Sequence, residues 1–258
     1  MQTQLQIIPI PAFQDNYLWL IHNGTKAIVV DPGDAVPVKD TLAKLDLQLE
    51  AILITHHHQD HIGGVKPLLS SFPDIQVYAP RHEHYDFPHN PVSEPDHLRC
   101  ADWLPEAKII DLPGHTLGHI AYLMQYDNQH WLFCGDTLFG AGCGRLFEGT
   151  PQQMYQSLQK LKALPTDTKV YCTHEYTLHN INFALTLEPG NLALQQRKQD
   201  TLALLARHQP SLPSNLALEL ATNPFLRCDS AEIRVSTLTQ NESEVTTFGK
   251  IRELRNHY

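Results

Sequence analysis

The eleven residues from Ala51 to His61 constrain this chain more than any other part of its sequence. The run begins as a strand-length apolar segment and ends with four side chains of types that ligate metals, His56, His58, Asp60 and His61. If the segment stays extended, alternate side chains share a side, which groups His56, His58 and Asp60. The turn at Gly63-Gly64 then brings in His61. Four donors within six residues exceed what one tetrahedral ion with an open position needs, so they indicate two ions that share a site.

Three further segments supply donors in similar surroundings. His115, Asp136 and His174 each follow a predicted strand, at 108–112, 131–134 and 169–172 respectively. Loops after the carboxyl ends of strands commonly collect functional residues in α/β folds. The set contains imidazoles and carboxylates but no cysteine, and structural zinc sites usually recruit thiolates. These seven donors therefore predict catalytic ions, whereas we interpret a cluster such as His82-Glu83-His84 as a solvated surface.

Composition narrows the class of protein and its setting. The chain has 258 residues, 42% of them hydrophobic and 18% charged, which is typical of a globular protein. A formal net charge of −9 argues against a nucleic-acid binder held by a basic surface. No apolar run approaches the ~20 residues of a membrane span. Five cysteines without a CxxC pair, and no basic leader before Lys26, favour a reducing cytoplasmic location.

The order of apolar and amphipathic segments predicts the fold class. Helical patterns over 35–46, 64–72 and 150–164 lie between strand-length runs, which predicts an α/β fold with mixed sheets covered by helices. After about residue 174 the pattern turns helical. We therefore expect a catalytic domain over 1–173 and a helical domain over 174–258. The strand-length runs are at 5–10, 17–21, 27–30, 51–55, 75–78, 108–112, 120–124, 131–134 and 169–172.

Helix starts in the second half follow from capping residues. Asn191 is expected to open a helix over 192–208, and Pro151 suits the first turn of the helix near 150–164. Asp229, followed three residues later by Glu232, has the spacing of a capping box. Thr246 or the next threonine is expected to cap a final helix.

Taken together, these segments resemble the metallo-β-lactamase superfamily, whose His-x-His-x-Asp-His signature matches residues 56–61. The superfamily's other motifs follow in order, with Asp31 in an Asp-Pro-Gly turn and then the donors at 115, 136 and 174. More narrowly, the chain is similar to the glyoxalase II (hydroxyacylglutathione hydrolase) family over essentially its whole length. The segments that carry this likeness are Phe133-Cys-Gly-Asp-Thr-Leu-Phe139, Ala141-Gly-Cys-Gly-Arg145 and Cys172-Thr-His-Glu-Tyr176.

The resemblance implies a metallo-β-lactamase-like αββα sandwich of two mixed sheets, followed by a small helical substrate-binding domain. It also implies two divalent ions, most often zinc, although iron and manganese accept the same donors. One ion would be bound by His56, His58 and His115. The second would be bound by Asp60, His61 and His174, with Asp136 bridging both. Asp31 would orient a ligand histidine, although a plain turn residue explains it equally well.

The implied glutathione contacts are Arg145, Phe147, Tyr176, Arg252 and Arg255. Arg252 and Arg255 are three residues apart, so a helix places both on one face, and guanidinium groups suit carboxylates. The alternative is a solvated basic helix end favoured by the helix dipole. Many family members have lysine at 145 and tyrosine at 147. Phe147 could make contact only through its ring or backbone.

The activity implied is hydrolysis of S-(2-hydroxyacyl)glutathione, notably S-D-lactoylglutathione, to glutathione and D-lactate, the second step of methylglyoxal detoxification. A hydroxide activated by the two metals, and oriented by the catalytic carboxylates Asp60 and Asp136, would attack the thioester. The departing thiolate, with a free pKa near ~8.5, needs no general acid. Cys143 is interpreted as structural. We expect a monomer that acts on a small molecule and binds neither nucleic acid nor membrane.

Other functions of the same superfamily fit less well. A β-lactam hydrolase leaves the helical tail and the paired arginines without a role. An RNA-processing nuclease needs a basic surface, whereas residues 1–170 hold 11 basic and 19 acidic residues. A di-iron oxygen reductase normally has glutamate at position 58 and needs a flavin domain, and a persulfide dioxygenase uses one iron. A non-enzymatic glutathione-binding or metal-buffering protein stays open on the residues alone.

Overall fold

The computed structural model describes residues 4–258, and the chain divides into two compact units that interleave along the sequence. Unit 1 runs to Asp111 and includes Gly118–Gly135, while unit 2 holds Leu112–Leu117 and Asp136–Tyr258. The short loop 112–117 therefore belongs with the second half of the chain. The expected boundary between a catalytic domain and a helical domain after residue 173 stays a prediction.

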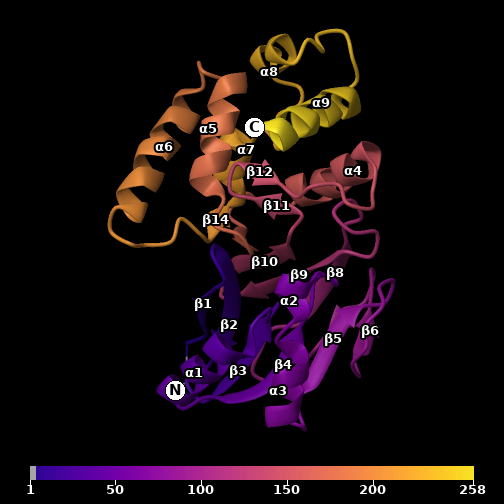
Figure 1. Ribbon diagram of the computed structural model, residues 1–258, viewed down its shortest axis with the longest axis vertical. Coiled ribbons are helices and arrows are strands. Elements are labelled where there is room, and N and C mark those ends of the chain that lie inside the picture. The colour runs from indigo at the N-terminus through magenta and orange to yellow at the C-terminus, as the bar shows by residue number, and fades with distance from the viewer. Residues whose placement is uncertain (1–3) are drawn as a thin grey trace. The chain divides into compact units, whose positions relative to one another are not determined.

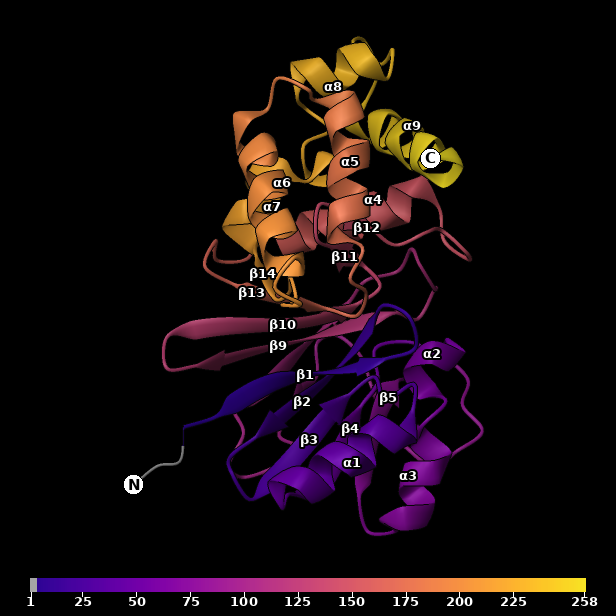
Figure 2. The same cartoon turned by 60° about the vertical axis from the view of Figure 1, so that its left-hand side comes forward.

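The first sheet of unit 1 is mixed and has the strand order β1-β2-β3-β4-β5-β6. Its first three strands are antiparallel, and those from β3 onward are parallel. Figures 1 and 2 show α1 (Ala35–Leu45) and α3 (Val65–Ser71) covering one face of this sheet, where Val38 and Leu68 are buried. The strands are β1 (Gln6–Ala12), β2 (Asn16–His22), β3 (Lys26–Val30), β4 (Gln48–Leu53), β5 (Gln76–Pro80) and β6 (Asn90–Val92).

The second group of strands in unit 1 is antiparallel and runs β7 (His97–Leu98), β8 (Ala107–Asp111), β9 (Ile120–Tyr126) and β10 (Gln129–Gly135). The buried hydroxyl of Tyr122 in β9 donates to the backbone carbonyls of Ile54, at 2.8 Å, and Tyr78, at 3.2 Å. Burial raises the pKa of Tyr122, which keeps the hydroxyl neutral as a donor. Because the backbone N–H of Ile120 also bonds the carbonyl of Thr55, at 3.0 Å, the start of β9 is tied to the chain after β4.

Unit 2 is mostly helical. It contains the hairpin β11 (Leu138–Phe139) and β12 (Gly142–Cys143), and the antiparallel pair β13 (Lys169–Cys172) and β14 (Ser214–Asn215). Helices α5 and α6 lie side by side in both views, around a core that includes Ile181 and Leu194. The helices are α4 (Pro151–Lys162), α5 (Thr177–Leu187), α6 (Leu192–Leu205), α7 (Leu216–Thr222), the 3₁₀ helix η1 (Pro224–Leu226), α8 (Ala231–Ser236) and α9 (Glu244–His257).

Most local expectations agree with these elements, and the exceptions concern helix starts. Each of the nine predicted strand runs overlaps a strand, and α6 begins after Asn191, whose side chain accepts the N–H of Leu194 at 3.1 Å. The expected cap at Asp229 is wrong, because the cap residue of α8 is Ser230. The expected cap at Thr246 is also wrong, since Ser243 accepts the N–H of Thr246 at 3.1 Å. In both cases a serine precedes an acidic first turn, but only Ser243 caps its helix with its side chain, because the hydroxyl of Ser230 donates to Glu188 at 2.6 Å instead.

Within residues 4–258, none of the helices combines the length and the apolar character that crossing a bilayer requires.

Candidate active site

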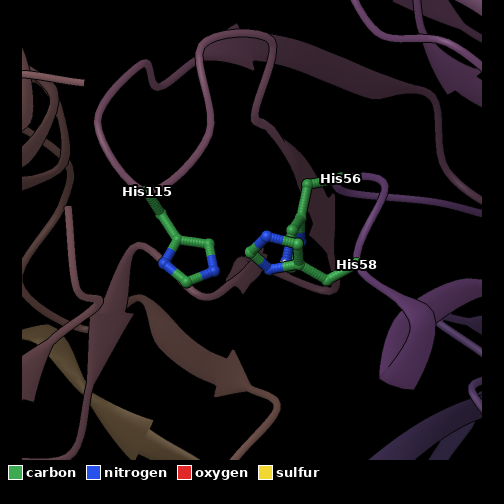
Figure 3. Close-up of side chains that lie close together, drawn as sticks. All are labelled: His56, His58 and His115. Atoms are coloured by element: carbon green, nitrogen blue, oxygen red, sulfur yellow. The ribbon is translucent and has the colours of Figure 1, made fainter. Parts of the chain in front are cut away.

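The predicted ligands of unit 1 follow the end of β4. The chain is extended through His58, which has φ −64° and ψ 146°, and a short helix, α2 (Gln59–Ile62), begins directly after it. Asp60 and His61 therefore project from a helical turn. The expectation that Asp60 continues an extended segment is wrong, because the carbonyl of Gln59 accepts the N–H of Gly63 at 2.7 Å and closes that turn. Figure 3 shows the rings of His56 and His58 close together, with Nε2 of the first 3.1 Å from Nδ1 of the second.

Asp31 anchors the segment that contains His56 to His61 through buried hydrogen bonds. It is buried, with φ at +50°, and its Oδ1 accepts the backbone N–H of Thr55 at 2.7 Å. Its Oδ2 accepts the hydroxyl of Thr55 at 2.7 Å and lies 3.0 Å from Nδ1 of His61. Because Nδ1 of His61 faces a carboxylate, the lone pair belongs to Nε2, which lies 3.5 Å from Asp60. Asp31 is thus a turn residue whose side chain also orients a predicted ligand, as metal-binding histidines require.

Several contacts in unit 1 involve residues that the sequence did not single out. Asn16 donates its side-chain amide to Oδ2 of Asp60 at 3.0 Å. The buried ring of His119 stacks on His56 with 4.7 Å between ring centroids. Glu83, interpreted from the sequence as part of a solvated surface, instead has a buried carboxylate, which lies 3.2 Å from Nδ1 of His57. No spacing in the sequence marks these residues, since their partners lie in distant loops.

In unit 2 two predicted ligands, His115 and His174, converge on the carboxylate of the third, Asp136. Nε2 of His115 and Nε2 of His174 lie 3.3 and 3.4 Å from Oδ2 of Asp136. Nδ1 of His115 is 2.8 Å from the backbone carbonyl of Arg145, so this nitrogen donates and Nε2 carries the lone pair. The ring of Tyr176 stacks on His174, with 4.7 Å between centroids and 3° between planes. Imidazoles oriented in this way, together with carboxylate oxygens, suit zinc, iron or manganese.

A cavity of about 430 Å³ opens within unit 2 beside His115 and Asp136. Its volume lies in the range of small-molecule sites. The five residues expected to contact substrate all line it, and His179 and Asn180, which the sequence did not single out, line it too. The full lining is His115, Asp136, Phe139, Cys143, Arg145, Phe147, Tyr176, His179, Asn180, Arg252 and Arg255.

The cavity is crowded with positive charge. Burial lowers the pKa of Arg255, and the neighbouring charges of Arg252 and Arg145 lower it further. Asn180 accepts two hydrogen bonds from the Arg255 guanidinium, at 3.1 and 3.0 Å. Arg252 is only 5% exposed, and its Nη1 donates to the carbonyl of Cys143 at 2.7 Å. Neither arginine is therefore a solvated helix end, and an anionic ligand in the cavity would relieve their repulsion.

Two further lining residues have restricted chemistry. Burial raises the pKa of Cys143 to about 11, despite the opposing effect of Arg252, so its thiol is neutral near pH 7 and is a poor nucleophile. Phe147 is 64% exposed, and its ring lies 5.3 Å from that of His115. The N–H of Phe147 donates to the carbonyl of His115 at 3.3 Å, so a ligand could meet the ring through an apolar contact but not this N–H.

Comparison with known proteins identifies the superfamily and the fold of the chain. Residues 13–174 match the model of the metallo-beta-lactamase superfamily. ETHE1 from Myxococcus xanthus has a TM-score of 0.66 at 23% identity, over 97% of this chain and 90% of that one. The BLEG-1 B3 metallo-beta-lactamase has a TM-score of 0.64 at 23% identity, over 87% of this chain and all of that one. These likenesses confirm the expected metallo-β-lactamase fold and, at such identity, nothing further.

The remainder of the chain and its full-length relatives are more specific. Residues 175–258 match the model described as hydroxyacylglutathione hydrolase C-terminus. A hydroxyacylglutathione hydrolase from Methylobacillus flagellatus is 54% identical over 98% of this chain and 99% of its own. One from Aeromonas salmonicida is 49% identical over 95% and 96%. The chain belongs to the hydroxyacylglutathione hydrolase family.

Gly144 offers a test of how tightly the cavity wall is packed. A Cβ at this position would lie 1.9 Å from the carbonyl oxygen of Asp136. We therefore expect Gly144→Ala to lower the free energy of unfolding by ~1–3 kcal/mol, measured by urea denaturation, because backbone must move. Gly249→Ala in α9 is the control. Its Cβ meets nothing closer than 3.6 Å, and it should stabilise by ~0.5–1 kcal/mol. A wild-type urea midpoint for Gly144→Ala would contradict the packing.

Proposed function

We propose that the protein is a metal-dependent thioesterase that hydrolyses S-(2-hydroxyacyl)glutathione, in particular S-D-lactoylglutathione, to glutathione and D-lactate. That reaction is the second step of methylglyoxal detoxification. One observation carries the proposal. A single cavity in unit 2 is lined both by the ligand-type residues His115 and Asp136 and by the guanidinium groups of Arg145, Arg252 and Arg255. Membership of the family, across both of its sequence models, supports the same substrate.

We propose two zinc ions as cofactors, held by the seven donors that the sequence indicated. His56, His58 and His115 would hold the first ion. Asp60, His61 and His174 would hold the second, and Asp136 would bridge the two. The orientation of His61 by Asp31 and of His115 by a backbone carbonyl supports this role. Two divalent ions bound there would lower the pKa of a shared water and polarise the thioester carbonyl.

The chain's own residues account for orientation and recognition. Asp60, steadied by Asn16, and Asp136 would accept hydrogen bonds from the attacking water and so fix its direction. Arg255, held by Asn180, would bind a glutathione carboxylate, since a guanidinium presents paired donors to such a group. The departing thiolate has a pKa near ~8.5 and leaves without a proton donor. The neutral thiol of Cys143 is therefore not required as a proton donor.

We also propose that the enzyme works as a cytoplasmic monomer on a small-molecule substrate, with no nucleic-acid or membrane partner. None of its five cysteines, all within residues 4–258, is paired in a disulfide, which suits a reducing compartment. The net charge of −9 disfavours binding to a polyanion.

Metal removal tests the reaction directly. Exhaustive chelation should abolish turnover of S-D-lactoylglutathione, and titration with zinc should restore it at two equivalents per chain. Atomic absorption and a thioester absorbance assay on the same samples give both quantities, and a β-lactam serves as the comparison substrate. Full turnover by a metal-free preparation, or a better rate on the β-lactam, would contradict the proposal. Full activity with one ion per chain would contradict the pair of ions.

Asp31→Asn tests whether the carboxylate behind His61 prepares the metal site. An amide that keeps its oxygen on the N–H of Thr55 must turn its NH₂ towards Nδ1 of His61, which favours the wrong tautomer. We expect zinc affinity to fall by ~10–100-fold in a competition assay with a chelating dye. Asp34→Asn, in the same loop, is the matched control, because Asp34 caps α1 and asparagine caps equally well. Equal zinc affinity for the two variants would sink this role for Asp31.

Arg255→Ala tests recognition of the glutathione moiety. Losing a charge-assisted hydrogen bond should lower kcat/KM by ~10–100-fold, mainly through KM, with metal content unchanged. Lys250→Ala is the control. It removes the same charge from α9 at an exposed position paired with Glu253 at 2.8 Å, and it should leave KM unchanged. An unaltered KM in Arg255→Ala would rule out this contact.

A further inference from the structure

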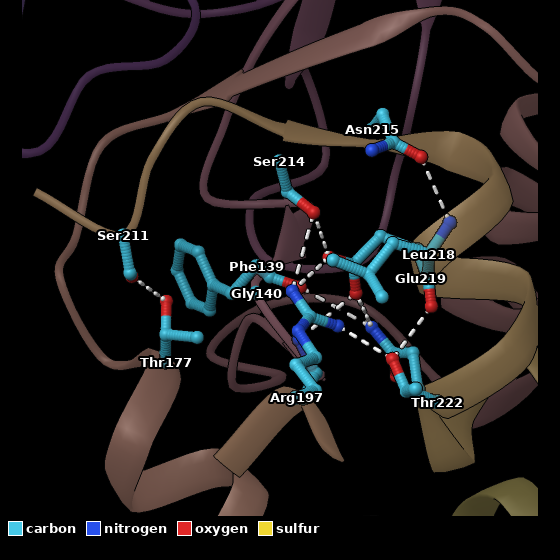
Figure 4. Close-up of polar contacts among 12 residues, drawn as sticks. Phe139, Gly140, Thr177, Arg197, Ser211, Ser214, Asn215, Leu218, Glu219 and Thr222 are labelled. Carbon is cyan, nitrogen blue, oxygen red and sulfur yellow. Dashed lines mark hydrogen bonds and ion pairs between the residues drawn. The ribbon is translucent and has the colours of Figure 1, made fainter. Parts of the chain in front are cut away.

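A fully buried ion pair in unit 2 lies outside the set of residues assigned to the proposed reaction. Glu219 of α7 is 0% exposed and Arg197 of α6 is 4% exposed, and Nη2 of the arginine lies 2.5 Å from Oε1 of the glutamate. The hydroxyl of Ser214 donates to the same oxygen, and Arg197 also donates to Thr222 at 2.6 Å (Figure 4). A buried carboxylate is strongly destabilising unless it is paired and hydrogen-bonded. These partners satisfy one of its two oxygens.

The other oxygen of Glu219 faces the β11–β12 hairpin. Oε2 accepts the backbone N–H of Ala141 at 2.9 Å and the side-chain amide of Asn223 at 3.1 Å. Ala141 has φ at +54°, a left-handed conformation that alanine rarely adopts without support. The same amide of Asn223 donates to the carbonyls of Phe139, at 3.2 Å, and Gly142, at 2.9 Å. Glu219 and Asn223 together therefore bind three backbone groups of the hairpin.

This hairpin forms part of the cavity wall. Phe139 and Cys143 line the cavity, and the ring of Phe139 lies 5.7 Å from that of His174 and 5.5 Å from that of Tyr176. The hairpin follows Asp136 directly along the chain. Its ladder has only two residues in each strand, too few to hold its position alone. Its placement consequently depends on the side chains that bond its backbone.

We infer that Glu219 is a positioning residue for the proposed thioesterase reaction, acting through the hairpin 138–143 rather than through substrate or metal. Arg197 neutralises the carboxylate, and Oε2 supplies the acceptor that keeps Ala141 in its left-handed turn. The hairpin then presents Phe139 and Cys143 to the cavity in one conformation. The kinetic part of this inference rests on the proposed function, whereas the conformational part does not.

Two matched double variants distinguish the role of Glu219 as a hydrogen-bond acceptor from the role of its charge. Arg197→Met/Glu219→Gln and Arg197→Met/Glu219→Leu both remove both charges and the bond to Thr222. Only glutamine keeps an oxygen for the N–H of Ala141, with its NH₂ turned towards Ser214. We expect the glutamine variant to keep kcat and KM within about threefold of wild type. The leucine variant should lose at least about tenfold in kcat/KM, because a buried N–H is left without an acceptor.

Thiol reactivity gives a readout that does not depend on catalysis. Cys143 is 4% exposed in the hairpin, with a raised pKa, so it should react slowly with dithionitrobenzoate in the wild type. The leucine variant should expose one additional fast-reacting thiol, which disappears when Cys143→Ala is added. The glutamine variant should react like wild type. Equal reactivity and equal kinetics in the two double variants would overturn the inference.

A third variant keeps the test decisive if the leucine variant does not fold. Asn223→Ser retains an oxygen for the N–H of Phe225, bonded at 3.1 Å in the wild type, but loses the amide that binds the hairpin carbonyls. It should raise the reactivity of Cys143 about tenfold, and a wild-type rate would refute the hairpin's dependence on these side chains. If wild-type protein does not hydrolyse glutathione thioesters, the proposed function fails, while the thiol measurements still decide the conformational part.

Discussion

The hydrogen bond between Asp31 and His61 shows the constraint on which the candidate site depends. An imidazole can offer a lone pair to a metal in a fixed direction only if its other nitrogen is bonded to something rigid. Asp31 does this for His61, and it is itself anchored by two bonds from Thr55 at the end of β4. In unit 2 the carbonyl of Arg145 does the same for His115. The strands thus position the predicted ligand histidines, and buried hydrogen-bond acceptors orient their imidazole rings.

Charge is distributed in a way that suits an anionic small molecule. The chain as a whole is acidic, yet Arg145, Arg252 and Arg255 share one cavity. Arg252 has a double role there, because it lines the cavity while donating to the carbonyl of Cys143. Its loss would therefore disturb the hairpin as well as the electrostatic field. Arg255, whose partner is the side chain of Asn180, is the cleaner position at which to test the proposed substrate recognition.

The β11–β12 hairpin links the helices of unit 2 to this cavity. Its carbonyls accept from Asn180, Asn223 and Arg252, while Glu219 accepts the N–H of Ala141. Few of its backbone groups are used by its own short ladder. Burying a charged pair contributes little net stability in general, so specificity of conformation is the better reason for its presence here. The helical segment thereby shapes the wall of the cavity as well as supplying residues to it.

The sequence by itself singled out the predicted donors and the strands that precede them, because apolar runs of strand length and signature spacings are local properties. It also placed Arg252 and Arg255 together, since a three-residue separation on a helix is enough. Only the tertiary structure decided that α2 begins after His58, that Asn16 bonds Asp60, and that residues 112–117 join the second unit. Each of these depends on partners distant in sequence. Contacts such as that of Ala141 with Glu219, 78 residues apart, leave no periodic signal in a single chain.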